Sequence, residues 1–336
     1  MWKVLLIVIS SNLLAAKINK KSMFTKRKTM VYEFNPTNKS LNERVQKARQ
    51  ERKLIQTPRL TLFPVSTDDA PYAFMWVSDA EVAKYMRYTP YTKVQDEAEW
   101  LAQLASDNSG VELGVFLPDG TLIGSVGLFS TAPNEYELGY HFNRAYWGKG
   151  YATEACKAVL DWATVFCSAQ CFSANYAKQN ARSEAVVNKC GFTFDRFGEI
   201  TKIDGSETFI SKHCVLNAPT VCKMNLYKQP FAAICAGHKT IELRLYDEKR
   251  RALNVGDLIA FNCDGKTAVA HVTELNVFSS FDELYANVDL SKCGYLPLEV
   301  PFASPKDMNV YYSASERKKW GAVAIGIDLH GVLYTE

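Results

Sequence analysis

The segment at residues 136–155 constrains the fold most, because it places a strand, a glycine turn and a helix in direct succession. It reads YELGYHFNRAYWGKGYATEA. Residues 136–142 alternate as a strand does, and the turn Trp147-Gly148-Lys149-Gly150 is followed by helical periodicity over residues 151–166. This part of the chain is therefore predicted to fold as an α/β domain in which a helix begins directly at the glycine turn.

Glycines at the start of a helix favour an anion site. They let phosphate groups approach the backbone, and the free amide groups of the helix N-terminus offer positive potential. A plain connection between a strand and a helix has the same pattern, so the turn alone leaves both interpretations open. It is not a P-loop, because no Gly-Lys-Ser/Thr follows a four-residue spacer, and it lacks the third glycine of the dinucleotide-binding fingerprint.

Strand and helix patterns continue on both sides of this segment up to residue 216. Pro118-Asp119-Gly120 marks the turn of a hairpin between two alternating strands. The predicted strands are 59–64, 111–117, 121–129, 136–142, 171–176, 191–197 and 207–216, and the predicted helices lie in 66–86, 94–104, 151–166 and 180–190.

The pattern changes after residues 217–222, which we interpret as a linker because Pro219 interrupts strand pairing. Beyond it, many short strands indicate a small β-barrel with short helices. The predicted strands are 223–226, 240–245, 258–263, 268–275 and 322–329, and the predicted helices are 230–236 and 281–288.

A length of 336 residues with 47% hydrophobic and 22% charged residues fits about two soluble globular domains and excludes a wholly disordered or collagen-like chain. The charge is uneven: residues 1–59 hold 14 Lys or Arg against 3 Asp or Glu. We therefore separate a basic N-terminal extension, residues 1–56. Its apolar run at 4–16 resembles the core of a signal peptide or belongs to a mis-assigned start, and it is too short to span a membrane.

The nine cysteines include no C-x-x-C pair and form no closely spaced cluster with histidine, so no metal site is predicted. Most of them fall in apolar runs, where a free cysteine acts as a small core residue. Reduced thiols favour a reducing compartment, and we expect a cytoplasmic protein.

Residues 57–216 resemble the GNAT acetyltransferase family, in particular its branch of ribosomal-protein N-acetyltransferases. Four stretches carry the resemblance: TPRLTLFPV, YELGYHF, YWGKGYATEA and NARSEAVVNKCGF. The resemblance implies a mixed, mainly antiparallel sheet flanked by helices, and acetyl-CoA as co-substrate.

The resemblance also implies which residues contact acetyl-CoA. The pantetheine arm would lie along the strand at Tyr140 and Phe142, and Asn180 and Ser183 would face the thiol end. In one departure from the family, the position three residues before the first loop glycine is Ala145 rather than Gln or Arg. The pyrophosphate would lie on the backbone of Trp147, Gly148, Lys149, Gly150, Tyr151 and Ala152.

Acetyl transfer needs a base for the amine and an acid for the thiolate. Strand alternation puts Glu137, Gly139 and His141 on one face, and Glu137 matches the family's usual base; a structural or solvated glutamate is the alternative. His141 is expected to be a half-buried histidine whose ring nitrogens have hydrogen-bond partners. Where many relatives carry a tyrosine acid this chain has Glu184, so the acid is Ser183, water or no group at all.

Residues 223–330 resemble the ASCH domain, a PUA-like barrel associated with RNA and nucleosides. The run at 237–244, Gly-His-Lys-Thr-Ile-Glu-Leu-Arg, carries the resemblance most specifically. Lys239, Glu242 and Arg244 are the candidate nucleic-acid or nucleoside site, and cations beside aromatic rings suit a phosphate with a stacked base. The alternative is a structural strand in which Glu242 pairs with Lys239 or Arg244. Further cations and aromatic partners are Lys249, Arg250, Arg251, Tyr227, Phe231, Tyr246, Tyr311 and Tyr312.

The sequence thus predicts an acetyl-CoA-dependent N-acyltransferase that works by direct transfer, without a membrane partner. Its acceptor would be a protein N-terminus, a small amine or an RNA-associated amine, and the ASCH barrel would recruit RNA, a nucleoside or a ribonucleoprotein. One alternative is a nucleotide- or RNA-binding protein whose GNAT half only senses acetyl-CoA. The other is hydrolysis of N4-acetylcytidine through Lys239, although Glu242 stands where such hydrolases carry threonine.

Overall fold

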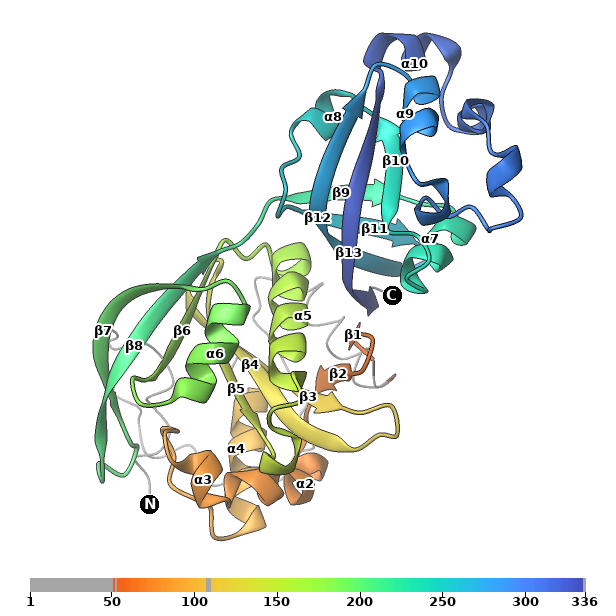
Figure 1. Cartoon of the computed structure of the whole chain (residues 1–336). Coiled ribbons are helices and arrows are strands. Elements are labelled where there is room, and N and C mark those ends of the chain that lie inside the picture. The colour runs from red at the N-terminus through yellow and green to blue at the C-terminus, as the bar shows by residue number, and fades with distance from the viewer. Residues whose placement is uncertain (1–50, 52, 107–109, 335–336) are drawn as a thin grey trace. The chain divides into compact units, whose positions relative to one another are not determined.

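The computed structural model describes residues 51, 53–106 and 110–334, so the predictions for residues 1–50 lie outside it. The described chain divides into two compact units (Figure 1). The first holds Arg59–Ala218 with Leu54, and the second holds residues 219–334 with Ile55–Pro58. The division falls within the linker predicted at 217–222, and strand β9 of the second unit already begins there, at Val221.

The first unit is built on a mixed sheet with the strand order β7-β8-β6-β5-β4-β3-β2. All neighbours are antiparallel except β5 and β6, which run parallel. This is the mixed, mainly antiparallel sheet that the family resemblance implies. Its strands are β2 (Thr61–Pro64), β3 (Gly110–Phe116), β4 (Leu122–Ala132), β5 (Glu135–Phe142), β6 (Cys171–Ala177), β7 (Thr193–Thr201) and β8 (Thr208–Asn217).

Helices cover both faces of this sheet, and β5 shows which helix lies on which face. The ring of His141 packs edge-on against Trp76 of α2, whereas the Tyr140 hydroxyl donates to the backbone of Ser183 in α6. Successive strand residues point to opposite faces, so α2 and α6 lie on opposite sides. The helices of this unit are η1 (Thr67–Asp69), α2 (Ala70–Val77), α3 (Ala80–Ala83), α4 (Val94–Ser106), η2 (Arg144–Tyr146), α5 (Tyr151–Phe166) and α6 (Ala181–Lys189).

The second unit contains the strand path β1-β13-β12-β11-β9, and β10 pairs with the other end of the long β13. Among the described residues no pairing joins β9 to β10, so the hydrogen bonds of the predicted barrel do not close into a ring. Its strands are β1 (Ile55–Gln56), β9 (Val221–Asn225), β10 (Ile241–Leu245), β11 (Leu258–Cys263), β12 (Lys266–Phe278) and β13 (Ala322–Tyr334).

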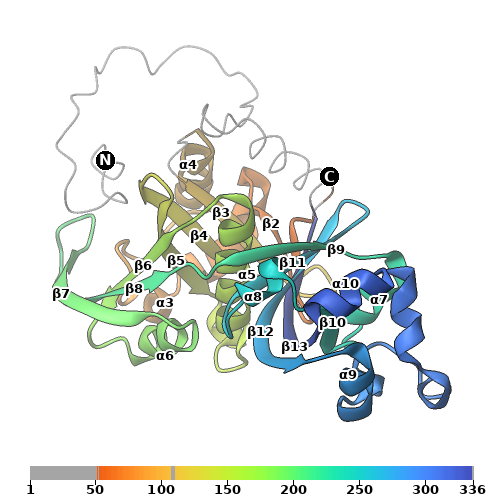
Figure 2. The ribbon, with the colours of Figure 1, turned by 90° about the horizontal axis from the view of Figure 1, so that it is seen from above.

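Short helices complete the second unit, and α10 lies beside β10 (Figure 2). Phe281 and Leu284 of α9 are buried together with Leu243 and Leu245 of β10. None of the helices in the described ranges has the length and apolarity needed to cross a membrane. The helices are α7 (Lys228–Cys235), α8 (Glu248–Arg251), α9 (Phe281–Asn287), η3 (Leu290–Lys292), η4 (Val300–Phe302), η5 (Pro305–Val310) and α10 (Ala314–Trp320).

Candidate functional site

The glycine turn has the backbone conformation that an anion-binding loop needs. Gly148 and Gly150 adopt φ angles of 74° and 81°, a region that residues with a Cβ rarely occupy. Gly150 is the N-cap of α5, and no side chain caps the helix there. The first amide groups of α5 can therefore donate hydrogen bonds to an external anion. Apart from the chain neighbours of Gly148, no atom of the described residues lies within 4 Å of where a Cβ on it would stand.

Arg59 holds this loop in place, a role that the sequence did not predict. Its guanidinium pairs with Glu154 at 2.6 Å, donates to the Lys149 carbonyl at 3.0 Å and covers the ring of Tyr151 at 4.7 Å. The loop and the first turn of α5 are thus tied to a residue 95 positions earlier. No local signal marks Arg59, because its partners are set by the packing of the sheet edge against the helix.

The parallel strands β5 and β6 diverge next to the loop. Their pairing covers only three registered pairs and ends at Glu137 and Ser173. A cavity of about 200 Å³ opens beside this gap. Four of the predicted site residues come together on its wall: Glu137, Tyr140, Asn180 and Ser183. The loop residues 147–152 are not among the residues that line it.

Local hydrogen bonds set the positions of these residues. Asn180 is the N-cap of α6, and its side chain accepts from the backbone amide of Ser183. The Tyr140 hydroxyl donates to the Ser183 carbonyl at 3.1 Å, across the gap between β5 and α6. Glu184 forms an ion pair with Lys212, so the residue in the family's tyrosine position is held by a cation on β8. Phe142 is buried, and its carbonyl accepts from the indole of Trp147 at 2.8 Å.

Glu137 lies on β5 and faces the cavity. Burial raises the pKa of its carboxyl group, and the positive charge of Arg87 partly offsets this shift. A carboxylate with a raised pKa is a better proton acceptor than a solvated one. Its environment therefore suits a general base.

His141 belongs to a buried hydrogen-bond network, as the sequence predicts. Its Nδ1 lies 3.0 Å from the Tyr88 hydroxyl, and its Nε2 lies 3.0 Å from Glu112 Oε1. Burial raises the pKa of Glu112 and lowers that of His141, but each charge stabilises the other strongly enough to reverse both shifts. Glu112 also accepts from Ser125. His141 and Glu112 therefore form a buried ion pair at the wall of the cavity.

Glu97 on α4 also lines the cavity, and sequence reasoning missed it. Burial raises the pKa of its carboxyl group to about 7, because the charge of His141 lowers it less than burial raises it. The only sequence signal was its place in a predicted helix, where a glutamate is usually exposed.

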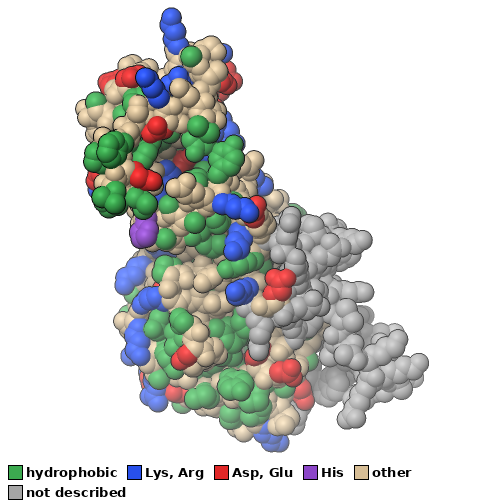
Figure 3. Space-filling view, turned by 90° about the vertical axis from the view of Figure 1, so that its right-hand side faces the viewer, with side chains coloured by type: hydrophobic (Ala, Val, Ile, Leu, Met, Phe, Trp, Pro, Cys, Tyr) green, Lys and Arg blue, Asp and Glu red, His purple; other side chains and the backbone are tan. Residues whose placement is uncertain are grey.

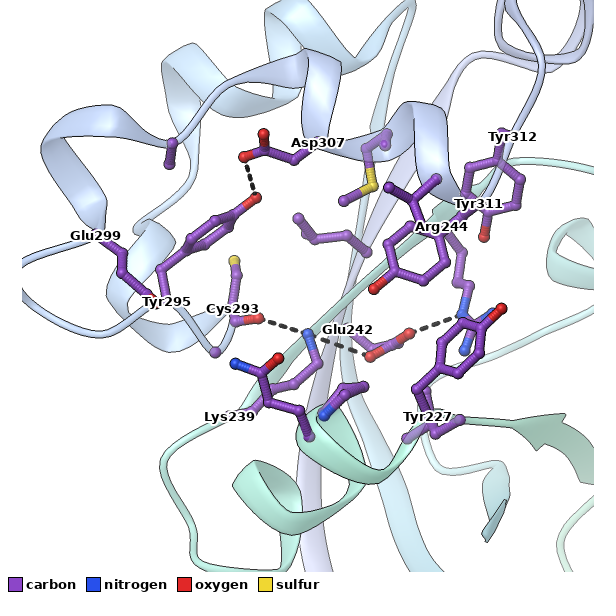
Figure 4. A pocket seen from close by; sticks show the side chains of 18 of the residues that line it. Tyr227, Lys239, Glu242, Arg244, Cys293, Tyr295, Glu299, Asp307, Tyr311 and Tyr312 are labelled. Atoms are coloured by element: carbon purple, nitrogen blue, oxygen red, sulfur yellow. Dashed lines mark hydrogen bonds and ion pairs between the residues drawn. The ribbon is translucent and has the colours of Figure 1, made fainter.

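A second and larger cavity, of about 850 Å³, lies in the second unit (Figure 4). Lys239, Glu242 and Arg244 come together there. The two oxygens of Glu242 face Lys239 Nζ at 3.3 Å and Arg244 Nε at 2.7 Å. Lys239 Nζ also donates to the carbonyl groups of Cys293 at 2.6 Å and Ile241 at 3.1 Å. The structural pairing that the sequence left open is thus present, with Glu242 bound to both cations.

Aromatic rings stand over this charged floor. Tyr227 and Tyr311 are 66% and 48% exposed, and their ring centroids lie 5.8 Å apart. Figure 3 shows hydrophobic side chains gathered around charged ones in the upper part of the view. Tyr312 lines the cavity too, but Phe231 is buried in the core. Of the other predicted partners, Lys249, Arg250, Arg251 and Tyr246 do not line the cavity.

Comparisons with known proteins match each unit to a separate family. Residues 59–193 match the acetyltransferase (GNAT) domain, and residues 224–330 match the ASCH domain.

Two curated relatives carry the name of N-acetyltransferases. An uncharacterized N-acetyltransferase, p20 of Bacillus licheniformis, is 28% identical over 144 residues, which are 41% of this chain and 81% of that protein. The uncharacterized N-acetyltransferase YnaD of Bacillus subtilis is 26% identical over 144 residues, or 43% of this chain and 84% of that protein. A solved GNAT-family acetyltransferase from Bacillus anthracis aligns with a TM-score of 0.45 and 22% identity, over 49% of this chain and 98% of that one.

Proposed function

We propose that this chain, an N-acetyltransferase with a GNAT acetyltransferase domain and an ASCH domain, transfers the acetyl group of acetyl-CoA directly to an amine in the cavity beside β5. The observation that carries the proposal is that three features lie next to one another in the first unit. An uncapped helix N-terminus follows two glycines with positive φ, the strands β5 and β6 diverge beside it, and the half-buried Glu137 faces the resulting cavity.

The chain's residues divide the binding of acetyl-CoA between them. The backbone of Trp147, Gly148, Lys149, Gly150, Tyr151 and Ala152 would hold the pyrophosphate. The open space at Gly148 and the missing side-chain cap at Gly150 fit such an anion. Tyr140, Phe142 and Asn180 would border the pantetheine arm where β5 and β6 diverge.

In this mechanism Glu137 accepts, through a water molecule, the proton that the acceptor amine loses as it attacks the thioester carbonyl. Collapse of the tetrahedral intermediate breaks the carbon–sulfur bond, and the thiolate takes a proton from Ser183 or from water. No acyl-enzyme forms. Ser183 lines the same cavity as Glu137, which supports this assignment.

Replacing Glu137 by glutamine should lower kcat by about 100-fold or more, because the amide cannot accept a proton. The Kd for CoA should stay unchanged, since the pyrophosphate loop is untouched. Because the pKa of Glu137 is raised, wild-type kcat should fall as the pH drops through a value above the ordinary glutamate range, and this acidic limb should disappear in the variant. Steady-state kinetics across pH measures the fall in kcat and the loss of the acidic limb. Unchanged turnover would exclude Glu137 as the base.

For the ASCH domain we propose binding of a nucleoside or RNA rather than hydrolysis. The exposed pair of Tyr227 and Tyr311 offers a surface for stacking, and Arg244 lies at the floor below it. Lys239 donates to two carbonyl groups and forms an ion pair with Glu242, so its ammonium group is held by the protein rather than presented to a ligand as a nucleophile. Calorimetric titration with nucleosides and short RNAs tests this proposal.

A non-catalytic acetyl-CoA sensor is the second candidate function. A cytoplasmic location fits the acetyltransferase and the sensor alike. The observation that favours a sensor is Glu184, which replaces the family's tyrosine and is paired with Lys212. Tight CoA binding without transfer to any amine tested would support the sensor and contradict the enzyme.

A further inference from the structure

The cavity beside β5 combines carboxyl groups with aromatic rings. Three glutamates line it: Glu97, Glu112 and Glu137. Among its aromatic residues are Tyr85, Tyr88, Tyr91, Trp100 and Phe129. Aromatic faces and carboxylates both attract cations, and together they form the usual surroundings of a bound ammonium group.

Two of the three carboxylates already have positive partners. Glu112 faces His141 at 3.0 Å, in an ion pair whose side chains are 8% and 10% exposed. The positive charge of Arg87, which also lines the cavity, lowers the pKa of Glu137. The negative charges of these two glutamates are therefore at least partly balanced from within the protein.

Glu97 differs from the other two. It is only 2% exposed, and within residues 51, 53–106 and 110–334 no hydrogen bond or ion pair to its carboxyl group is found. A buried carboxyl group without a partner is costly, so its persistence calls for a compensating group. The charges that act on the pKa of Glu97 are those of His141, which Glu112 already balances, and of Glu112 itself. The remaining space next to it is the cavity.

We propose that Glu97 binds a positively charged group of the acceptor. The acceptor is then a small molecule that carries an ammonium group in addition to the amine that is acetylated. A cavity of about 200 Å³, smaller than typical sites for drug-sized ligands, fits such a molecule. This inference rests on the proposed function, because it takes the same cavity as the acceptor site.

Matched probes test the inference: 1,5-diaminopentane has an ammonium group at both ends, and 1-aminopentane has it at one end only. Each is titrated by calorimetry into the full chain, with CoA and without it. We expect the diamine to bind at least about tenfold more tightly than the monoamine. In Glu97→Gln, which keeps the shape of the side chain, this difference should shrink to less than about twofold. The matched control is Glu99→Gln on the exposed face of the same helix, which should behave as wild type.

Proton release provides a second readout that a purely structural role for Glu97 does not predict. With a pKa of about 7, Glu97 is about half protonated at pH 7. A bound cation favours the ionised form, so the diamine should displace up to about half a proton. Titrations in buffers of different ionisation enthalpy measure this number, which should fall by that amount in Glu97→Gln.

Three results would overturn the inference: neither amine binds, both bind equally to the wild type, or Glu97→Gln keeps the preference. Each of these leaves the proposed acetyl transfer standing if CoA binds and kcat depends on Glu137. Conversely, diamine selectivity that depends on Glu97 in a chain that binds no CoA would retain this site and reject the proposed function.

Discussion

Replacing Gly148 by glutamate should weaken CoA binding by about 100-fold or more, which is about 2.7 kcal/mol in binding free energy. Gly148 has a φ of 74°, so any side chain there strains the turn by about 1–2 kcal/mol. The space around its missing Cβ is open, so the new carboxylate would stand where the pyrophosphate is expected and repel it. Calorimetric titration with CoA measures the loss.

The matched control is Gly120→Glu in the turn between β3 and β4. Gly120 has a φ of 86°, and in the described part of the chain no atom beyond its neighbours lies within 4 Å of its missing Cβ, so the substitution causes similar backbone strain away from the loop. It should leave the Kd for CoA within about twofold of wild type. If both variants lose binding equally, strain explains the loss. If neither does, the pyrophosphate does not bind at this loop.

Replacing Lys239 by methionine should destabilise the second unit by about 3 kcal/mol. Lys239 and Glu242 are 7% and 5% exposed in their side chains, and removal of the lysine leaves a buried carboxylate with Arg244 as its remaining cation. It also leaves the Cys293 carbonyl without the donor at 2.6 Å. Amide hydrogen exchange in β10 and β13 reports the stability of this unit separately, and it should become about 100-fold faster.

Lys292→Met is the control for the loss of a lysine charge in the same unit. Its ammonium lies 3.9 Å from Asp289, and its side chain is 60% exposed. An exposed pair contributes little, so exchange should change by less than about fivefold. Equal effects of the two substitutions would mean that burial of the Lys239 pair does not stabilise the unit. Faster exchange in Lys239→Met alone supports a structural cation and argues further against a nucleophilic lysine.

Secondary structure could be predicted where the signal is local. The predicted bounds of α5 and β11 are those of the structure, because a glycine turn followed by helical periodicity and a short apolar run are both local signals. Strand β1 could not be predicted: it is two residues long, and only pairing with Leu333 and Val332 of β13 makes it a strand. Helix α10 had a readable signal that was missed, since Ser313 and Glu316 form a capping box.

The same distinction holds for the sites. The amino-acid sequence by itself determined that a glycine turn opens α5, that Glu137 and His141 share a face of β5, and that Lys239 directly precedes the strand that carries Glu242 and Arg244. These relations depend on the spacing of residues within one element or directly beside it.

Only the tertiary structure decided the partners of these residues. It places Arg59 on Glu154, Glu112 on His141 and Lys239 on the Cys293 carbonyl, across separations of 95, 29 and 54 residues. It also buries Glu97, which its helix pattern left unremarkable. The physical reason is that burial and electrostatic pairing depend on which elements pack together. That packing is set by the whole sheet and its helices rather than by the spacing of nearby residues.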